Sequence, residues 1–328
     1  MRLLMLGGTE FVGRAVVEAA VARGWEVTVF HRGRHQAPPG VESLLGDRAA
    51  PDGLAALAGG GGRWDVVVDT WAGDPVAVRD AARLLAGRAG RYVYVSSRSV
   101  YAWPWAPGLD EDGPLVAGSP DATGVGYAEA KRGGELAALD AFGEERVLLG
   151  RAGLIVGPWE NVGRLPWWLR RIARGGPVLA PGPRDLPLQY IDVRDLAGWL
   201  LDAAQAARSG PYNLVSPPGH TTTGELLDAC VRVTGSDAEL CWTEPGPILA
   251  AGIEPWSGLP IWAPPGELHD ALHRAGVSRA LAAGLRCRPV AETVADTWAW
   301  LRTTGGAPGT ERSPLGITPE QEAAALGR

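Results

Sequence analysis

The alternation of two kinds of segment over roughly the first 150 residues limits what this chain can fold into. Short apolar segments lie at 2–6, 26–30, 41–45, 65–69 and 91–96, and another lies at 147–156. Ala-rich stretches with helical spacing separate several of them, the first at 12–23. Strands that alternate with helices pair in parallel and are covered by helices on both faces. We therefore expect an α/β fold, a Rossmann-type doubly wound parallel sheet.

The second half of the chain has a different texture. After Gly157 and Pro158, the residues Trp, Pro and Gly become dense and turns interrupt the helical segments. We expect a Rossmann domain over 1–157 with return segments at about 186–215, in which 188–193 forms a strand that rejoins the sheet, 195–206 a helix and 212–215 another strand. A smaller, discontinuous lobe then comprises 158–185 and 216–303, and 304–328 forms a loosely attached tail.

Bulk composition excludes several classes of protein. The net charge is −6 over 328 residues, so no basic field would hold nucleic acid or an anionic membrane. Cys230, Cys241 and Cys287 are too few and too scattered for a disulfide framework, and they form no C-x-x-C pair for zinc. No apolar run approaches the roughly 18 residues of a membrane span, and glycines interrupt the apolar start of the chain. We expect a cytoplasmic protein without nucleic-acid or membrane partners.

The first strand-to-helix turn is rich in glycine. Residues 7–13 are Gly-Gly-Thr-Glu-Phe-Val-Gly, at the position where helix N-terminal amides bind a dinucleotide pyrophosphate. Gly7 would permit the tight turn and Gly13 the close approach of the helix, although an ordinary strand-to-helix turn can have the same pattern. Glu10 is a departure, because it replaces the middle glycine and puts an acid near the phosphates. The expected cofactor contacts of this loop are Gly7, Thr9, Glu10, Phe11, Val12 and Gly13.

The end of the second strand predicts which nicotinamide dinucleotide is used. An acid there would bind the adenosine ribose hydroxyls of NAD, whereas basic groups would bind the 2′-phosphate of NADP. This chain has His31, Arg32 and Arg34 and no carboxylate, so we expect NADP(H) to be preferred, with NAD(H) as the alternative. The alternative is that Arg32 and Arg34 are two solvated surface residues with no role in cofactor binding, because the sequence would be the same. Other residues expected to line the cofactor at strand ends are Asp47, Arg48, Thr70, Trp71 and Ala72.

A candidate catalytic set follows the fifth apolar segment. Tyr127 and Lys131 are four residues apart, which places both on one face of a helix, and Lys131 is the only lysine in the chain. A phenol with a pKa near ~10 exchanges protons at neutral pH only when a cation stabilises its anion, and Lys131 can do that. Ser97 lies at the end of the segment 91–96 and could polarise a substrate carbonyl while Tyr127 supplies the proton that accompanies hydride transfer.

These motifs together resemble the extended short-chain dehydrogenase/reductases of the NAD-dependent epimerase/dehydratase family. The resemblance covers nearly the whole chain and rests on residues 7–13, 95–101, 127–131, 151–158 and 189–196. It implies a Ser97, Tyr127 and Lys131 catalytic site, and it adds Gly153 and Leu154 to the expected cofactor contacts. It also suggests that Gly133 and Gly134 serve a helix contact between subunits, so a homodimer is one expectation.

Departures from the family pattern bear on the substrate. Many members of the family bind nucleotide sugars through an Asn and an Arg, at the positions that are Leu154 and Leu188 here. The family's dehydratases have the sequence Thr-Asp-Glu where this chain has Ser97, Arg98 and Ser99. The expected pocket wall is instead aromatic, drawn from Trp71, Trp103, Trp105, Trp159, Trp167 and Trp168, although Trp is often a core residue. The predicted substrate contacts are Trp71, Ser99, Trp103, Trp159 and Trp167.

The leading hypothesis is an NADPH-dependent oxidoreductase that reduces a ketone or aldehyde of a small apolar or ring-containing substrate. One alternative is a nucleotide-sugar epimerase or oxidoreductase with tightly bound NAD, and another is a non-catalytic RNA-binding or regulatory relative. We expect no metal site, because His220, His269 and His273 show no ligand spacing with nearby acids and are interpreted as structural or surface residues.

Overall fold

The computed structural model describes residues 1–303 and 315–328, and its centre is a seven-stranded parallel sheet. The strand order is β11-β6-β5-β4-β1-β2-β3, so the chain winds outward from β1 to one edge and then to the other. The strands are β1 (Arg2–Leu6), β2 (Glu26–His31), β3 (Glu42–Leu45), β4 (Trp64–Asp69), β5 (Ala89–Ser97), β6 (Val147–Ala152) and β11 (Gly210–Leu214). This order confirms the Rossmann-type doubly wound fold.

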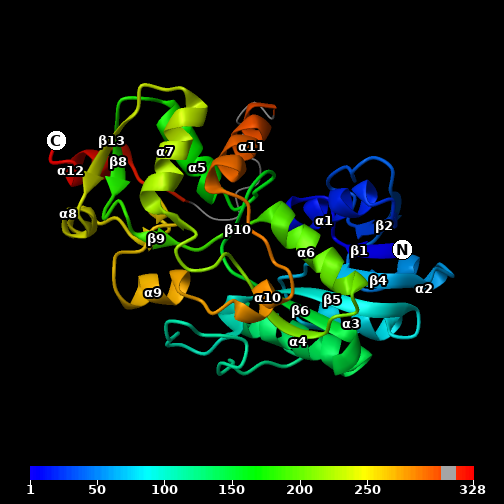
Figure 1. Ribbon diagram of the computed structural model, residues 1–328. Coiled ribbons are helices and arrows are strands. Elements are labelled where there is room, and N and C mark those ends of the chain that lie inside the picture. The colour runs from blue at the N-terminus through cyan, green and yellow to red at the C-terminus, as the bar shows by residue number, and fades with distance from the viewer. Residues whose placement is uncertain (304–314) are drawn as a thin grey trace.

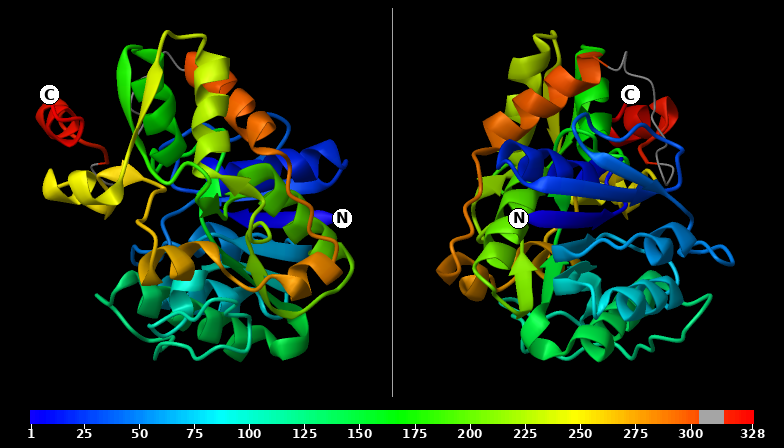
Figure 2. Two further views of the ribbon diagram at one scale, coloured as in Figure 1. Left: turned by 60° about the vertical axis from the view of Figure 1, so that its left-hand side comes forward. Right: turned by 90° about the vertical axis from the view of Figure 1, so that its right-hand side faces the viewer.

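Helices cover both faces of this sheet (Figures 1 and 2). On one face α1 (Phe11–Ala22) packs with α6 (Val193–Gln205), and on the other α3 (Val76–Leu85) packs with α4 (Tyr127–Phe142). Successive side chains of β1 divide between the two cores, with Leu3 and Met5 on the α1 face and Leu4 and Leu6 on the α3 face. Both faces are therefore apolar, which explains why the strands appear in the sequence as nearly continuous apolar runs.

A second lobe has a core of its own. It contains α5 (Arg164–Ala173), α7 (Thr223–Thr234), α11 (Val290–Thr303) and the parallel pair β8 (Pro177–Pro181) and β13 (Glu239–Thr243), around buried side chains that include Trp168 and Trp262. Local signals set the bounds of α7, since Thr222 and Glu225 form a capping box at its start and Gly235 adopts a left-handed conformation after its end. Smaller elements complete the lobe: α8 (Pro245–Ala250), β14 (Pro255–Trp256), β15 (Leu259–Pro260) and α12 (Pro319–Ala325).

Short elements connect the lobes or lie at their edges. They are α2 (Ala55–Gly59), η1 (Arg98–Val100), η2 (Glu144–Arg146), α9 (Glu267–His273) and α10 (Ser278–Ala282). Although α10 lies within the segment assigned to the second lobe, it contacts β11, and Ala280 is part of the core on the α1 face. This short segment of 216–303 therefore packs against the sheet.

The strand expected at 188–193 does not rejoin the main sheet, and that prediction is wrong. The segment is split into β9 (Pro187–Leu188), which pairs with β12 (Thr221–Thr222), and β10 (Ile191–Asp192), which pairs with β7 (Ile155–Val156). The strand ends at Asp192 because its carboxylate caps the next helix by accepting the Arg194 amide hydrogen at 2.8 Å. The expected strand at 147–156 is likewise interrupted, between β6 and β7.

The expectation of a loosely attached tail is wrong for residues 315–328. Ile317 and Ala325 contact the second core, and Glu322 of α12 forms an ion pair with Arg171 of α5 at 2.9 Å. The rest of the expected tail, 304–314, lies outside the described residues.

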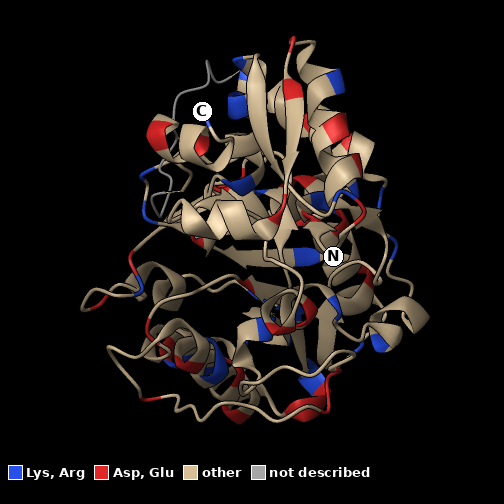
Figure 3. Cartoon of the chain, turned by 90° about the vertical axis from the view of Figure 1, so that its left-hand side faces the viewer, with Lys and Arg blue, Asp and Glu red and all other residues tan. Residues whose placement is uncertain are grey.

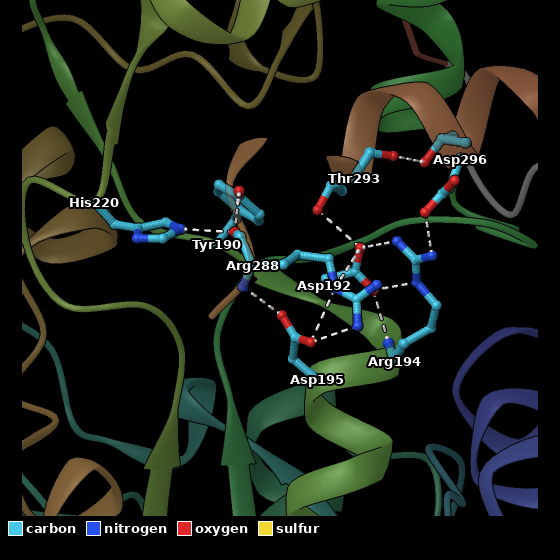
Figure 4. A network of polar contacts seen from close by, with 9 residues as sticks. Tyr190, Asp192, Arg194, Asp195, His220, Arg288, Thr293 and Asp296 are labelled. Carbon is cyan, nitrogen blue, oxygen red and sulfur yellow. Dashed lines mark hydrogen bonds and ion pairs between the residues drawn. The ribbon is translucent and has the colours of Figure 1, made fainter. Parts of the chain in front are cut away.

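A polar network joins α6 of the sheet domain to the second lobe (Figure 4). The buried Asp192 accepts hydrogen bonds from Arg194 Nη2 at 2.7 Å and from Thr293 Oγ1 of α11 at 2.8 Å. Next to it, Asp195 accepts three hydrogen bonds from the backbone and guanidinium of Arg288. The motif at 189–196 thus caps α6 and also connects α6 to the second lobe. Asp192 accepts a hydrogen bond from α11, and Asp195 accepts hydrogen bonds from Arg288, which precedes α11.

Basic and acidic residues are interspersed along the chain in both lobes, as the colours of Figure 3 show. This distribution agrees with the modest net charge of −6. Within residues 1–303 and 315–328, no helix is both long and apolar enough to cross a bilayer.

Candidate active site

The glycine-rich loop between β1 and α1 depends on close backbone approach. Gly7 and Gly8 adopt φ values of 113° and 95°, which side chains disfavour. A Cβ on Gly13 would lie only 2.6 Å from the Gly8 backbone nitrogen, so α1 can approach the loop only with glycine there. Thr70 lies beside the turn, with its Oγ1 3.0 Å from the position of a Cβ on Gly7. The first turn of α1 is thus open to a pyrophosphate at its N-terminus, as a dinucleotide site requires.

The acid in this loop turns toward the connection after β2. Glu10 is the N-cap residue of α1, makes no side-chain capping bond, and lies 3.6 Å from His35 Nε2 through its Oε1 atom. On the same connection, Arg32 and Arg34 are exposed and form no hydrogen bond or ion pair with the described residues. His31, at the end of β2, has a buried Nε2 without a hydrogen-bond partner, and burial lowers its pKa.

Arg48 is not part of that exposed basic pair. Its guanidinium forms two hydrogen bonds, of 2.7 and 2.8 Å, with the buried carboxylate of Asp69 at the end of β4, and the Tyr92 hydroxyl donates to the same carboxylate at 2.5 Å. Burial acts to raise the pKa of Asp69, but Arg48 and Tyr92 hold it below its ordinary value. Arg48 therefore fixes the loop after β3 to the strand ends, while the neighbouring Asp47 accepts the Ala49 amide hydrogen.

The ammonium of Lys131 forms hydrogen bonds with backbone carbonyl groups near the ends of two strands. It is 3% exposed, and its Nζ donates to the carbonyl oxygens of Trp71, after β4, at 2.6 Å and of Val95, in β5, at 2.7 Å. The ring of Tyr94 lies 4.9 Å from the ammonium. These contacts hold the charge near the carboxyl end of the sheet, where Asp69, the last residue of β4, is in register with Tyr94 and β5 continues to Ser97.

Tyr127 and Ser97 lie at the ends of the two elements that hold Lys131, namely α4 and β5. Tyr127 is the first residue of α4, one helical turn before Lys131, and its side chain is 52% exposed. Ser97 is the last residue of β5, where its Oγ accepts the Ser99 amide hydrogen and lies 3.1 Å from the Ser99 hydroxyl. The structure brings these three residues to the ends of adjacent elements at one edge of the sheet.

Close packing fixes α4 on the sheet. A Cβ on Gly134 would lie 2.4 Å from the Tyr94 hydroxyl, and a Cβ on Gly133 would lie 2.4 Å from the Ser119 carbonyl oxygen. Both glycines are thus accounted for by contacts within one chain.

A buried polar cluster adds a second constraint on α4. The Arg151 guanidinium of β6 donates to both carboxylate oxygens of Glu135 in α4, at 2.9 and 3.1 Å, and to the Tyr101 hydroxyl at 3.2 Å. Tyr101 in turn donates to Asn213 Oδ1 of β11 at 2.7 Å. Because these groups are buried, their mutual satisfaction fixes the helix that carries Tyr127 and Lys131 relative to the sheet.

The tryptophans divide into several environments. Trp71 adjoins the Lys131 anchor, and its ring nitrogen donates to the Asp74 carbonyl oxygen. Trp103 and Trp159 are both exposed; the ring of Trp103 lies 5.9 Å from that of Trp105, and the Arg14 guanidinium lies 3.8 Å from the ring of Trp159. Trp168 is buried in the second core, and Trp167 packs against it and against Gly316 of the C-terminal segment, so its ring is engaged in the second lobe.

The positions where the family pattern would place polar groups are apolar and filled. Leu154 and Leu188 are both buried in the second core, and a Cβ on Gly153 would meet the side chain of Val215. These two leucines offer no hydrogen bond to a pyrophosphate.

The three histidines singled out in the sequence link segments of the second lobe. His269 Nε2 lies 2.8 Å from the Pro187 carbonyl oxygen, and His220 Nε2 lies 3.0 Å from that of Arg288. His273 accepts the Gln189 amide hydrogen at Nδ1, and its Nε2 lies 3.2 Å from the Ile261 carbonyl oxygen. Each of the three rings therefore has at least one nitrogen in contact with the backbone.

Sequence reasoning missed a charged group that the fold places near Tyr127. Arg164 is the first residue of α5, its guanidinium carbon lies 5.4 Å from the ring of Trp256, and its Nε is buried without a hydrogen-bond partner. Burial lowers the pKa of Arg164, and the Glu160 carboxylate, followed by Tyr127, acts against that shift. Arg164, Trp256 and Tyr127 lie on three separate segments, so no local motif could have indicated the set.

This arrangement supports proton transfer beside a bound nicotinamide. Lys131 places a positive charge one helical turn from the Tyr127 phenol, and such a charge stabilises the phenolate. Ser97 offers a hydroxyl to a carbonyl oxygen that would share the Tyr127 proton. The dinucleotide itself would supply the hydride, and the open glycine turn and the exposed arginines are groups that fit its phosphates.

Comparison with known proteins agrees with the fold. The chain is 28% identical over 260 residues to the bovine (Bos taurus) epimerase family protein SDR39U1, covering 73% of this chain and 82% of the relative. Similar solved structures include the Bordetella bronchiseptica enzyme WbmH in complex with NAD⁺ (TM-score 0.67, 19% identity, 93% of this chain and 99% of that one). Another is Thermus thermophilus UDP-glucose 4-epimerase in complex with NAD (TM-score 0.63, 23% identity, 92% and 99%).

A family model matches most of the sheet domain and the site. The model of the NAD dependent epimerase/dehydratase family covers residues 3–215, which include the glycine-rich loop, Ser97, Tyr127 and Lys131. The chain therefore belongs to the NAD-dependent epimerase/dehydratase family, and it is an NAD(P)-dependent oxidoreductase acting on CH–OH or C=O groups.

Proposed function

We propose that this protein is an NADPH-dependent reductase of a ketone or aldehyde. The observation that carries the proposal is the connection after β2, where Arg32 and Arg34 are exposed, unpaired among the described residues and accompanied by no carboxylate at the strand end. A guanidinium pair there suits a 2′-phosphate, which NADPH carries and NADH lacks. In this proposal Tyr127 donates the proton, Lys131 stabilises the phenolate and Ser97 orients the carbonyl.

Cofactor binding tests the proposal without knowledge of the substrate. Intrinsic Trp fluorescence is titrated in parallel with NADPH and NADH, for the wild type and for Arg32→Ser/Arg34→Ser. Loss of charge-assisted bonds to a phosphate should weaken NADPH binding by about 10- to 100-fold and leave NADH binding unchanged. Arg208→Ser is the control, because Arg208 is exposed and lies just before β11, at the opposite end of the strands. Equal affinity of the wild type for both dinucleotides would contradict the proposal.

Turnover tests the assigned roles. A panel of ketones and aldehydes is followed by NADPH absorbance, and Tyr127→Phe should lower the rate by about 10²- to 10⁴-fold, the usual contribution of a general acid, without weakening NADPH binding. A Tyr127→Phe variant that retains wild-type turnover would remove the tyrosine from the proton path.

An epimerase with tightly bound NAD is the second candidate. It is favoured by the family to which the chain belongs and by the similar fold of a UDP-glucose 4-epimerase solved in complex with NAD. The buried Leu154 and Leu188 argue against a pyrophosphate clamp at those positions. Release of stoichiometric NAD on denaturing the purified protein, with no oxidation of added NADPH, would favour the epimerase.

A further inference from the structure

The buried ring of Tyr94 is the feature from which we draw a further inference. Tyr94 lies in β5, in the core under α3 and α4, and its side chain is fully buried. Its ring faces the ammonium of Lys131, with Nζ 4.9 Å from the ring centroid. Its hydroxyl donates to the Trp71 carbonyl oxygen at 3.0 Å, and the same oxygen accepts from Lys131 Nζ at 2.6 Å. The tyrosine thus meets the ammonium directly, through its ring, and indirectly, through a shared acceptor.

The position of this ring is fixed from several sides. A Cβ on Gly134 would lie 2.4 Å from the Tyr94 hydroxyl, so α4 packs directly on it. The Trp71 carbonyl that accepts from the hydroxyl is fixed as well, because the Trp71 amide donates to the buried Asp69 carboxylate at 2.9 Å and Arg48 binds that carboxylate. Burial raises the pKa of Tyr94 well above its ordinary value, so its hydroxyl remains a donor. The ring is therefore a rigid part of the wall around the ammonium.

The ammonium needs neighbours of this kind because it is buried. Lys131 is 3% exposed, and burial disfavours the charged form of an amine. The carbonyl oxygens of Trp71 and Val95 compensate in part. The negative face of an aromatic ring also attracts a cation, most strongly where water is excluded. Because the charge of Lys131 stabilises the phenolate of Tyr127 one helical turn away, any group that holds the ammonium also acts on the proton donor.

Tyr92 offers a comparison within the same strand. It lies two residues before Tyr94, in the same core, and is equally buried. Its hydroxyl donates to the Asp69 carboxylate, and its ring packs against that of Phe142 with the centroids 5.0 Å apart. The two tyrosines are thus alike in strand, core and burial, and they differ in the group that their rings contact.

We propose that Tyr94 is a positioning residue of the reaction, whose ring face holds the charge of Lys131 in the place where it stabilises the Tyr127 phenolate. This inference rests on the roles that the proposed function gives to Lys131 and Tyr127. Tyr94 itself exchanges no proton and acts only through the lysine. Without the ring, the ammonium would hold its proton less firmly and would be less fixed in place, so the phenolate would be less stable.

A pH titration of the Tyr127 phenolate by ultraviolet absorbance tests this inference without substrate or cofactor. The titration of each protein is corrected by subtracting that of the same protein with Tyr127→Phe, so only this phenol is followed. Tyr94→Leu should raise the midpoint by about 0.5 to 1 pH unit, because the ring face is lost. Tyr94→Phe keeps the ring and should keep the wild-type midpoint. Tyr92→Leu is the matched control and should keep it too, although it removes an equally buried ring from the same core.

A second pair of proteins separates the charge of the ring face from its packing. Phenylalanine and pentafluorophenylalanine at position 94 have nearly the same shape, but fluorination reverses the charge on the ring face. The fluorinated protein should therefore have a midpoint higher than that of Tyr94→Phe by about 0.5 pH unit or more. A cooperative thermal transition shows that each protein is folded, and this pair decides the matter if Tyr94→Leu does not fold.

Three results would overturn the inference. They are a wild-type midpoint in folded Tyr94→Leu, a shift in Tyr92→Leu as large as that in Tyr94→Leu, and equal midpoints for the phenylalanine and pentafluorophenylalanine proteins. Failure of the proposed function is separately visible in Lys131→Met, which should raise the midpoint more than any change at position 94. A wild-type midpoint in Lys131→Met would refute the role given to the lysine, whatever Tyr94 does.

Discussion

Protonation of His273 should cost this protein stability in weak acid. The imidazole is fully buried at the end of α9, and burial, followed by the neighbouring His269, lowers its pKa to about 4. Its Nδ1 accepts the Gln189 amide hydrogen, so the ring carries its proton on Nε2, facing the Ile261 carbonyl oxygen. A second proton would have to be placed on Nδ1, against a group that is already a donor.

The sign and size of the effect follow from linkage. An unfolded histidine has a pKa near 6.5, so between pH 6.5 and about 4 the unfolded chain binds a proton that the folded chain does not, and stability falls as the pH falls. At 1.36 kcal/mol per pKa unit the full difference is about 3 kcal/mol, of which about 2 kcal/mol is lost by pH 5.

Urea unfolding at pH 7.5 and pH 5.0 measures this loss. Wild type should lose about 2 kcal/mol more than His273→Gln between the two values, because the variant has no group to protonate. His35→Gln, which changes an exposed histidine, is the control. In parallel, NMR of the five imidazoles should show one that does not titrate above pH 5 and that is absent from His273→Gln. Equal losses in wild type and variant, or a His273 signal that titrates near 6.5, would refute the reasoning.

Three further substitutions test the supports of the site. Arg151→Met leaves the buried carboxylate of Glu135 with Arg132 as its only ion-pair partner among the described residues, and should lower the free energy of unfolding by about 1–3 kcal/mol; the double variant with Glu135→Met should recover part of it in thermal unfolding. Gly134→Ala should cost about 1–3 kcal/mol by the same assay, because its Cβ would lie 2.4 Å from the Tyr94 hydroxyl, whereas Gly87→Ala, with open space around it, is the control. Gly13→Ala should weaken dinucleotide binding at least about tenfold in the fluorescence titration, since its Cβ would displace the Gly8 backbone that shapes the phosphate loop; wild-type affinity in that variant would exclude the close approach.

The sheet domain was predictable because its determinants are local. Each strand is a short apolar segment, the glycine turn is continuous in sequence, and the carboxyl ends of parallel strands necessarily meet at one edge. Failures occurred where a side chain from elsewhere decides the outcome. The segment 188–193 has the composition of a strand, yet Asp192 is drawn into a network with Thr293, about a hundred residues away. The C-terminal segment is similarly fixed by the contact of Glu322 with Arg171.

Among the predicted cofactor residues, too, contacts with distant side chains decide an outcome that the sequence alone does not show. Arg32, Arg34 and Arg48 are equally basic in the sequence, and all three follow strands that end at the cofactor edge. Only the fold distinguishes them, because Asp69 lies in register with the end of β1 and binds Arg48, while the other two stay exposed. A count of basic residues would therefore overestimate the charge available to a phosphate.

The site thus combines a constrained half with an adaptable one. Tyr127 and Lys131 lie on a helix fixed by two glycine contacts, two carbonyl bonds and a buried ion pair, so a change of substrate cannot come from moving them. Arg164 and Trp256 are held by the second lobe, whose core is separate from those of the sheet. Because the second lobe has a core separate from those that hold the reacting groups, substitutions in it should change which carbonyl compound is bound while leaving the proton donor in place.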